Sequence, residues 1–171
     1  ACAYLLFGWA QHERAEVVAY NLAAARHHQP DQMIVKPTIG NLLLWRSVYT
    51  VGDSVHVDAV RVGNEPRVYS GQSAKLFDLD RDLAWAPPAS RARRDAERFS
   101  HFARGLLAFS PSKPHFLGDI RYAMLPTRIE PLWGIQLDPT DPQAPTRYQT
   151  QRSLAPALRD SFMTMLLGRN F

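Results

Sequence analysis

The chain has 171 residues with a formal charge of +4; 46% of its residues are apolar and 21% are charged. This composition excludes a disordered chain, and the length suits one globular domain with a sizeable core. The lone Cys2 excludes an intramolecular disulfide framework, and the small excess of 20 Lys and Arg over 16 Asp and Glu does not select nucleic acid or anionic lipid as a partner.

The first segment is apolar from Ala1 to Ala10 and turns polar at Gln11. It is shorter than the roughly 18 apolar residues that a membrane-spanning helix needs. From about Trp9 to His28 nothing breaks a helix, and apolar residues recur at steps of three and four. We therefore predict an amphipathic helix that ends near Pro30.

The next segment has the composition of β-strands. A strand is predicted from Met33 to Lys36. The runs LLLWRSVYT (42–50) and SVHVDAVRVG (54–63) flank Gly52 and Asp53, which predicts a β-hairpin with its turn at these two residues. Residues 65–88 are predicted to form an irregular connection with one short strand at 75–77.

Ser90 is the predicted N-cap of a second helix, because apolar residues recur behind it at helical spacing up to Leu106. The runs GDIRYAML (118–125) and LWGIQLD (132–138) are two more predicted strands. Residues 138–146 are rich in proline and predict a loop. A last helix is expected after Ser153.

The predicted order is α-β-β-β-α-β-β-α, which lacks the regular alternation of parallel α/β folds. We predict an α+β fold in which a mostly antiparallel sheet of about five strands is packed with helices. Residues 1–10 are interpreted as the stump of a membrane-proximal or transmembrane segment, residues 11–30 as a linker helix, and residues 31–171 as a single soluble α+β domain.

The candidate site residues are His56, Asp58, Asp119 and Arg121. Residues two apart on a strand share a face, so His56 and Asp58 form one polar pair and Asp119 and Arg121 a second. If the two strands are neighbours, the four side chains can bind an anion or a metal, or act as a hydrolytic site. The alternative is that they form cross-strand ion pairs with a structural role.

Two other patterns have structural interpretations. Adjacent residues on a helix point about 100° apart, so the pair His27 and His28 is interpreted as a solvent-facing helix end and not as a metal site. The arginine-rich helix SRARRDAERFSHFARG (90–105) could follow a phosphate backbone. We expect its charge to be offset by Arg91 with Asp95 and by Arg93 with Glu97, so nucleic acid is not an expected partner.

Four motifs carry a resemblance to a known family: KPTIGNLLLWRSVY (36–49), VHVDAVRVG (55–63), GDIRYAMLP (118–126) and LWGIQLDP (132–139). They resemble the C-terminal region of the YdjM-like family of predicted membrane-bound metal-dependent hydrolases of the bacterial inner membrane. The likeness covers about Gly8 to Asp138. In that family, transmembrane helices and the His and Asp residues suspected of holding metal precede this region, and those motifs have no counterpart in this sequence.

The resemblance implies a soluble C-terminal domain of a membrane-anchored hydrolase, with a regulatory, substrate-positioning or assembly role. A divalent metal and a phospholipase-like activity are implied for the parent family only, and this part of the chain is not expected to be catalytic alone. The expected partner is the inner membrane, through the N-terminal segment, with a second copy of the chain as the alternative. Arg14 and Arg26 follow the apolar run, which predicts a cytoplasmic domain.

Overall fold

The computed structural model describes residues 2–152 and 155–170. The chain forms two compact units, and each is considered by itself. Among the described residues, the first unit comprises 2–73, 125–128 and 155–170, and the second comprises 74–124 and 129–152. This division does not test whether residues 31–171 are a single domain, and that assignment stays a prediction.

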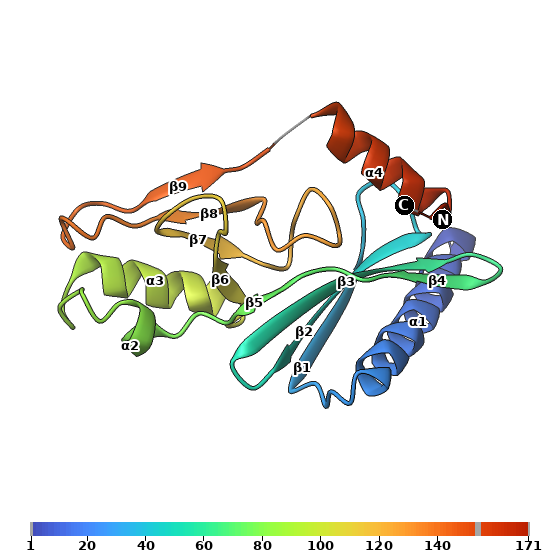
Figure 1. The fold of residues 1–171 in the computed structure, drawn as a ribbon, viewed down its shortest axis with the longest axis horizontal. Coiled ribbons are helices and arrows are strands. Elements are labelled where there is room, and N and C mark those ends of the chain that lie inside the picture. The colour runs from blue at the N-terminus through green and yellow to red at the C-terminus, as the bar shows by residue number, and fades with distance from the viewer. Residues whose placement is uncertain (1, 153–154, 171) are drawn as a thin grey trace. The chain divides into compact units, whose positions relative to one another are not determined.

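The first unit is built on an antiparallel sheet whose strands run in the order β1-β2-β3-β4 (Figure 1). Their bounds are β1 Gln32–Pro37, β2 Leu44–Val51, β3 Ser54–Val62 and β4 Pro66–Tyr69, and β5 (Ser73–Lys75) is the fifth strand, beside β3. The hairpin of β2 and β3 turns at Gly52, which has a φ of 56°, and at Asp53, as predicted. This hairpin is the centre of the sheet because both of its strands are almost wholly buried.

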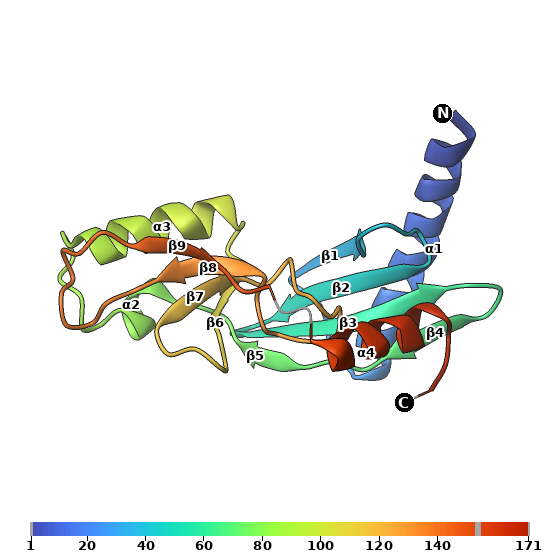
Figure 2. The same ribbon diagram turned by 90° about the horizontal axis from the view of Figure 1, so that it is seen from above.

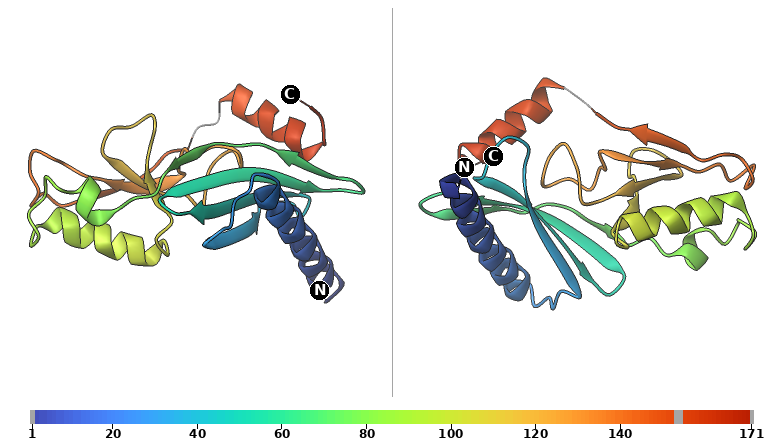
Figure 3. Two further views of the ribbon diagram at one scale, coloured as in Figure 1. Left: turned by 60° about the horizontal axis from the view of Figure 1, so that its bottom comes forward. Right: turned by 180° about the vertical axis from the view of Figure 1, so that it is seen from behind.

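Two helices lie on opposite faces of this sheet (Figure 3, left). Helix α1 (Cys2–Ala25) packs Ala15 and Ala19 against Trp45, Val60 and other residues of one face. Helix α4 (Pro156–Leu166) packs on the other face, where Met165 is buried among residues that include Leu44 and Ala59. Neighbouring strand residues such as 44 and 45 serve different cores because side chains alternate across a strand.

Helix α1 is longer at its N-terminal end than predicted and ends three residues earlier, at Ala25. Its buried positions recur every four residues: Gln11, Ala15, Ala19 and Ala23. Beyond them, the N-terminal turns extend past the edge of the sheet (Figure 2). The side chains of this end are therefore exposed.

The second unit contains a four-stranded antiparallel sheet in the order β6-β7-β8-β9. Its strands are β6 Leu107–Phe109, β7 Phe116–Asp119, β8 Trp133–Gln136 and β9 Arg147–Thr150. Helix α3 (Arg91–Phe102) covers the sheet, and the short α2 (Leu79–Asp82) precedes it. The core between α3 and the sheet includes Ala96, Phe99, Leu117 and Ile135.

The structure confirms the α+β class and the antiparallel pairing, but the predicted single sheet of about five strands is wrong. The described residues form two sheets, of five and four strands, and four helices. Sequence patterns missed β4, β6 and β9, because strands of three or four residues are too short to show an alternation. The helix capped by Ser90 is confirmed: its hydroxyl accepts a hydrogen bond from the backbone N–H of Arg93. The predicted start of the last helix after Ser153 lies outside the described residues.

A strand was predicted over residues 118–125, but only residues 118 and 119 of this run belong to a strand. Strand β7 ends at Asp119, and the chain turns there. One carboxylate oxygen of Asp119 accepts a hydrogen bond from the backbone N–H of Arg121 at 3.0 Å, an arrangement that favours a turn over a strand. Arg121 therefore lies beyond the strand instead of two positions along it.

Candidate functional site

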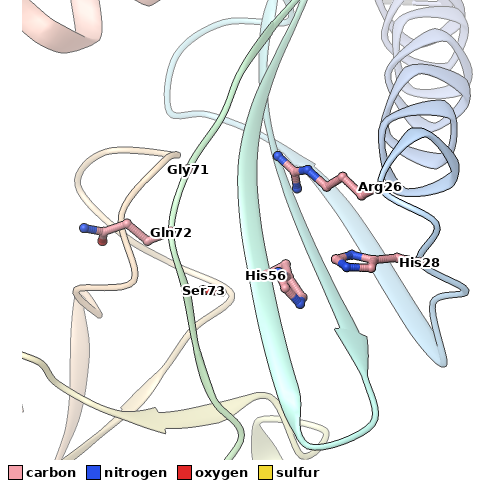
Figure 4. A pocket seen from close by; sticks show the side chains of 6 residues that line it. All are labelled: Arg26, His28, His56, Gly71, Gln72 and Ser73. Carbon is pink, nitrogen blue, oxygen red and sulfur yellow. The ribbon is translucent and has the colours of Figure 1, made fainter.

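A pocket of about 320 Å³ opens in the first unit, on the side of the sheet that α1 covers. Its walls are Arg26 and His28 from the segment after α1, His56 from β3, and residues 71–73 from the chain that leads into β5. Figure 4 shows the rings of His28 and His56 pointing toward each other, while the side chain of Gln72 points away from them. The pocket thus gathers one arginine and two histidines.

The side chain of Asp58 holds the arginine in place. Its two carboxylate oxygens accept hydrogen bonds from the Nη1 and Nη2 atoms of Arg26 at 2.7 and 2.8 Å. One of these oxygens also accepts the backbone N–H of Gly71 at 2.9 Å. The Asp58 side chain is 1% exposed and that of Arg26 is 28% exposed, so the carboxylate is covered while the guanidinium reaches the pocket. Hydrogen bonding to Asp58 raises the pKa of Arg26 further, so this residue is always a cation.

The hydroxyl of Tyr49 links Arg26 to His28. It lies 3.0 Å from Nη1 of Arg26 and 3.0 Å from Nδ1 of His28. Because the guanidinium can only donate, the Tyr49 oxygen accepts from it, and the second lone pair or the proton of the hydroxyl is available for Nδ1 of His28. With Nδ1 engaged by Tyr49, Nε2 is the ring nitrogen through which His28 can contact a ligand in the pocket.

His56 completes the cluster. Its ring stacks on Tyr49 with the centroids 5.0 Å apart and lies 4.7 Å from the His28 ring. Burial lowers the pKa of His56, and the neighbouring His28 and Arg26 lower it further. The ring is therefore neutral at pH 7 and has the capacity to take up a proton when a negative charge enters the pocket.

Close backbone approaches position the wall formed by residues 71–73. A Cβ on Gly71 would lie 2.2 Å from the carbonyl oxygen of Val57 and 2.6 Å from that of Thr127, so only glycine fits. The backbone N–H of Gln72 donates to that Thr127 oxygen at 3.0 Å. Arg46 of β2 anchors the segment that contains Thr127, because its Nη1 donates to the carbonyl oxygens of Pro126 and Arg128. Residues 71–73 are therefore linked to β2 through Thr127.

The structure brings the four predicted site residues together in pairs. His56 and Asp58 lie on the same face of β3, as predicted, and both belong to the cluster around Tyr49. Asp119 and Arg121 belong to the second unit, where the guanidinium donates to both carboxylate oxygens at 2.9 and 2.7 Å. Both Asp58 and Asp119 are thus paired with arginine, but neither is the cross-strand pair that was the stated alternative, because Arg26 follows α1 and Arg121 lies in the turn next to Asp119.

The sequence interpretation missed Arg26, His28 and Tyr49. His28 was expected to be solvent-facing, but the helix ends at Ala25 and the following turn brings its ring beside Tyr49. His27, with a φ of 59°, is exposed. Because Tyr49 is paired with His56 across β2 and β3, it could have been found from the hairpin register. No local signal pointed to Arg26, which reaches Asp58 across 32 residues of sequence.

The residues of this pocket do not fit the divalent metal that the family resemblance implies. Both oxygens of Asp58 accept hydrogen bonds from Arg26, and a fixed cation at that place repels a second one. We derive no metal-dependent step at this pocket.

A separate group, His12, Glu13 and Glu16, lies on one turn of α1 and offers ligand atoms within 4.8 Å of one another. Nε2 of His12 is 3.2 Å from the carbonyl oxygen of Val35 and 3.5 Å from a carboxylate oxygen of Glu16. These contacts account for the cluster as an anchor of α1 on β1, and we assign no metal to it.

Three of the four arginines of α3 contact acidic residues, although not all contact the expected partners, and Arg94 donates to the carbonyl oxygen of Ala89. Arg91 lies 3.5 Å from Asp95, which confirms that pair, and Arg98 also contacts Asp95. Arg93 pairs with Asp80 in place of the expected Glu97. Hydrogen bonds from Thr146 and Arg98, which outweigh the opposing effect of burial, lower the pKa of Asp95 and keep it ionised.

Among the described residues, no helix is both long enough and apolar enough to cross a membrane. Comparisons with protein-family models, with curated proteins and with solved structures gave no match.

Proposed function

We infer that this chain is the extramembrane domain of a membrane-anchored, hydrolase-like protein, and that the N-terminal end of α1 holds it at the lipid surface. The observation that carries the proposal is the exposure of five large apolar side chains on consecutive turns of α1. Their exposed fractions run from 51 to 69%, and they are Tyr4, Leu5, Leu6, Phe7 and Trp9. The role that fits a domain so placed is to position substrate, regulate the membrane-bound part or aid its assembly.

The apolar side chains surround the helix instead of forming one stripe. Successive residues on a helix are about 100° apart, so Tyr4 to Phe7 cover all sides. A helix that is apolar all round is stable when an apolar medium or protein surrounds it, and not when it is in water. This end of α1 therefore requires a covering, and lipid covers all sides at once.

The depth of the apolar end also suits a lipid surface. From Tyr4 to Trp9 the helix advances about 8 Å, much less than the roughly 30 Å hydrocarbon core, so this end enters only the outer part of one leaflet. Trp9 and Tyr4 are of the type enriched at membrane interfaces, and Arg14 lies just beyond them. The polar contacts of α1 begin at Gln11, whose side chain donates to the carbonyl oxygens of Leu42 and Val62.

A vesicle flotation assay tests this proposal. Burying the exposed part of a leucine contributes about 1.4 kcal/mol, so Leu5→Ser with Leu6→Ser is expected to weaken binding to phosphatidylcholine vesicles by about a hundredfold. Val17 and Tyr20 are 59% and 50% exposed on the same helix but outside the apolar end. The control, Val17→Ser with Tyr20→Ser, is expected to bind like the wild type.

Two results would contradict the proposal. One is a wild-type chain that does not float with vesicles. The other is a wild-type chain that forms a stable dimer through this end of α1, seen by light scattering and abolished by the two leucine substitutions, because a second copy would then be the covering.

A further inference from the structure

We propose that the pocket of Arg26, His28 and His56 binds a phosphate group, either on a small soluble compound or on a lipid headgroup. The proposal goes beyond a membrane-docking role and is independent of it. It rests on the kind of polar atoms that line the pocket and on the charge that each carries.

Arg26 provides the first part of the site. Its terminal edge, Nη1 with Nη2, is occupied by Asp58, and the second hydrogen of Nη1 is used by Tyr49. No described residue bonds to the side edge, formed by Nε and the second hydrogen of Nη2, so a ligand in the pocket can accept from it. A guanidinium edge of two parallel donors matches two oxygens of a phosphate or carboxylate.

The second argument is that the other walls also provide donors. Tyr49 engages Nδ1 of His28, so Nε2 is the atom that His28 can offer to an oxyanion, as a donor in the tautomer that carries the proton there or in the protonated ring. His56 faces it at a ring distance of 4.7 Å, and Ser73 also lines the pocket. Polar side chains from the segment after α1, from β3 and from β5 suit a tetrahedral oxyanion, which accepts from several directions, better than a planar carboxylate.

The third argument is the response of His56 to charge. The groups that face it are Tyr49, His28, Arg26 and Asp58. Burial, together with His28 and Arg26, disfavours the protonated form of His56. A phosphate dianion reverses this balance, so binding is accompanied by uptake of a proton on His56 and strengthens as the pH falls through the histidine range.

The test measures binding of inorganic phosphate to the whole chain by calorimetry and by the imidazole proton resonances. Because Asp58 already neutralises Arg26, we expect a Kd of about 1 mM at neutral pH, and the titration extends to about 10 mM phosphate. The variants are His28→Asn and His56→Asn. Asparagine keeps a polar atom near the place of Nδ1, so Tyr49 retains a partner in the first variant, while the group at Nε2 is lost.

Each variant is expected to weaken phosphate binding about tenfold, and the resonance of His56 in the wild type should titrate at a higher pH when phosphate is present. The matched control is His27→Asn, which changes an adjacent, exposed histidine and should bind like the wild type. Circular dichroism establishes that each variant is folded. A folded wild type without saturable binding, or binding that neither pocket variant weakens, overturns the proposal.

Vesicles distinguish the two sources of the phosphate. If the pocket binds a lipid headgroup, vesicles with added phosphatidic acid bind the chain more tightly than phosphatidylcholine alone, inorganic phosphate competes, and His56→Asn removes the gain. If it binds a soluble compound, the added lipid makes no difference and binding of inorganic phosphate persists. Loss of vesicle binding in the Leu5→Ser, Leu6→Ser variant affects only the membrane proposal, because that end of α1 lies about 30 Å along the helix from Arg26.

Discussion

The ion pair between Arg26 and Asp58 is expected to hold the C-terminal end of α1 on the sheet, and its removal provides a quantitative test. Replacing Asp58 with alanine removes two charge-assisted hydrogen bonds and leaves the guanidinium and the Gly71 N–H without their acceptor. Removing one partner of a buried ion pair costs about 3 to 5 kcal/mol. Because Arg26 is 28% exposed and keeps part of its hydration, we expect the lower end, about 3 kcal/mol.

The assay is a double-mutant cycle in urea unfolding, with Asp58→Ala, Arg26→Met and the two combined. Arg26→Met leaves the buried carboxylate with the Gly71 N–H as its donor and is expected to cost about 3 kcal/mol or more. The lost bond to Tyr49 is common to the Arg26 single and double variants and cancels in the cycle. The double variant leaves no unpaired charge, so we expect a coupling energy of about 2 to 3 kcal/mol.

The exposed pair Arg159 and Asp160 is the matched control. These residues lie 3.7 Å apart with side chains 77% and 71% exposed, and their coupling should be below about 0.5 kcal/mol. Additive effects of Arg26→Met and Asp58→Ala, with a coupling as small as in the control, would refute the structural role of the pair.

Two further substitutions test the pocket wall and the half-buried His56. Gly71→Ala should lower the free energy of unfolding by about 2 kcal/mol, since the added Cβ overlaps two backbone oxygens. In the control, Gly8→Ala within α1, the added Cβ meets Leu42 at an ordinary contact distance, so the substitution should raise the free energy of unfolding by about 0.5 kcal/mol. Equal effects of the two substitutions in urea unfolding would contradict the packing argument. Burial lowers the pKa of His56 in the folded chain from its ordinary value of 6.5. As the pH falls, His56 is therefore protonated in the unfolded chain before it is protonated in the folded chain. The stability due to the neutral ring is present above about pH 6.5 and decreases as the pH falls toward the lowered pKa. Thermal unfolding from about pH 8 to about pH 5.5 should therefore show a shallower loss for His56→Asn than for wild type or His27→Asn, and identical slopes would exclude this contribution.

Local sequence patterns were sufficient to predict an element wherever its own residues show the spacing, turn or cap that defines it. The hairpin was predicted because Gly52 and Asp53 separate two β-branched runs, and α3 because Ser90 can cap a helix of regular apolar spacing. The polar face of β3 with His56 and Asp58 also followed from the alternation of side chains alone. These features depend on neighbours within a few residues.

Local patterns failed where a short element depends on contacts elsewhere in the chain. Strand β9 is exposed at most of its positions and pairs with β8 through its backbone, so its side chains show no alternation. The turn after Asp119 was predicted as a strand because most residues of 118–125 are apolar. The hydrogen bond that the N–H of Arg121 donates to the Asp119 carboxylate, which forms the turn, is seen only in the structure.

The sequence by itself determined the apolar end of α1, the secondary structure of its longer elements and the polar face of β3, because each is a property of consecutive residues. Only the tertiary structure decided that Arg26 and His28 meet that face. They do so because α1 packs its alanines closely on the sheet, which brings its C-terminal end to Asp58 and Tyr49, residues 32 and 23 positions further along the chain. Contacts at such separations depend on how a helix lies on a sheet, which no periodicity in the chain records.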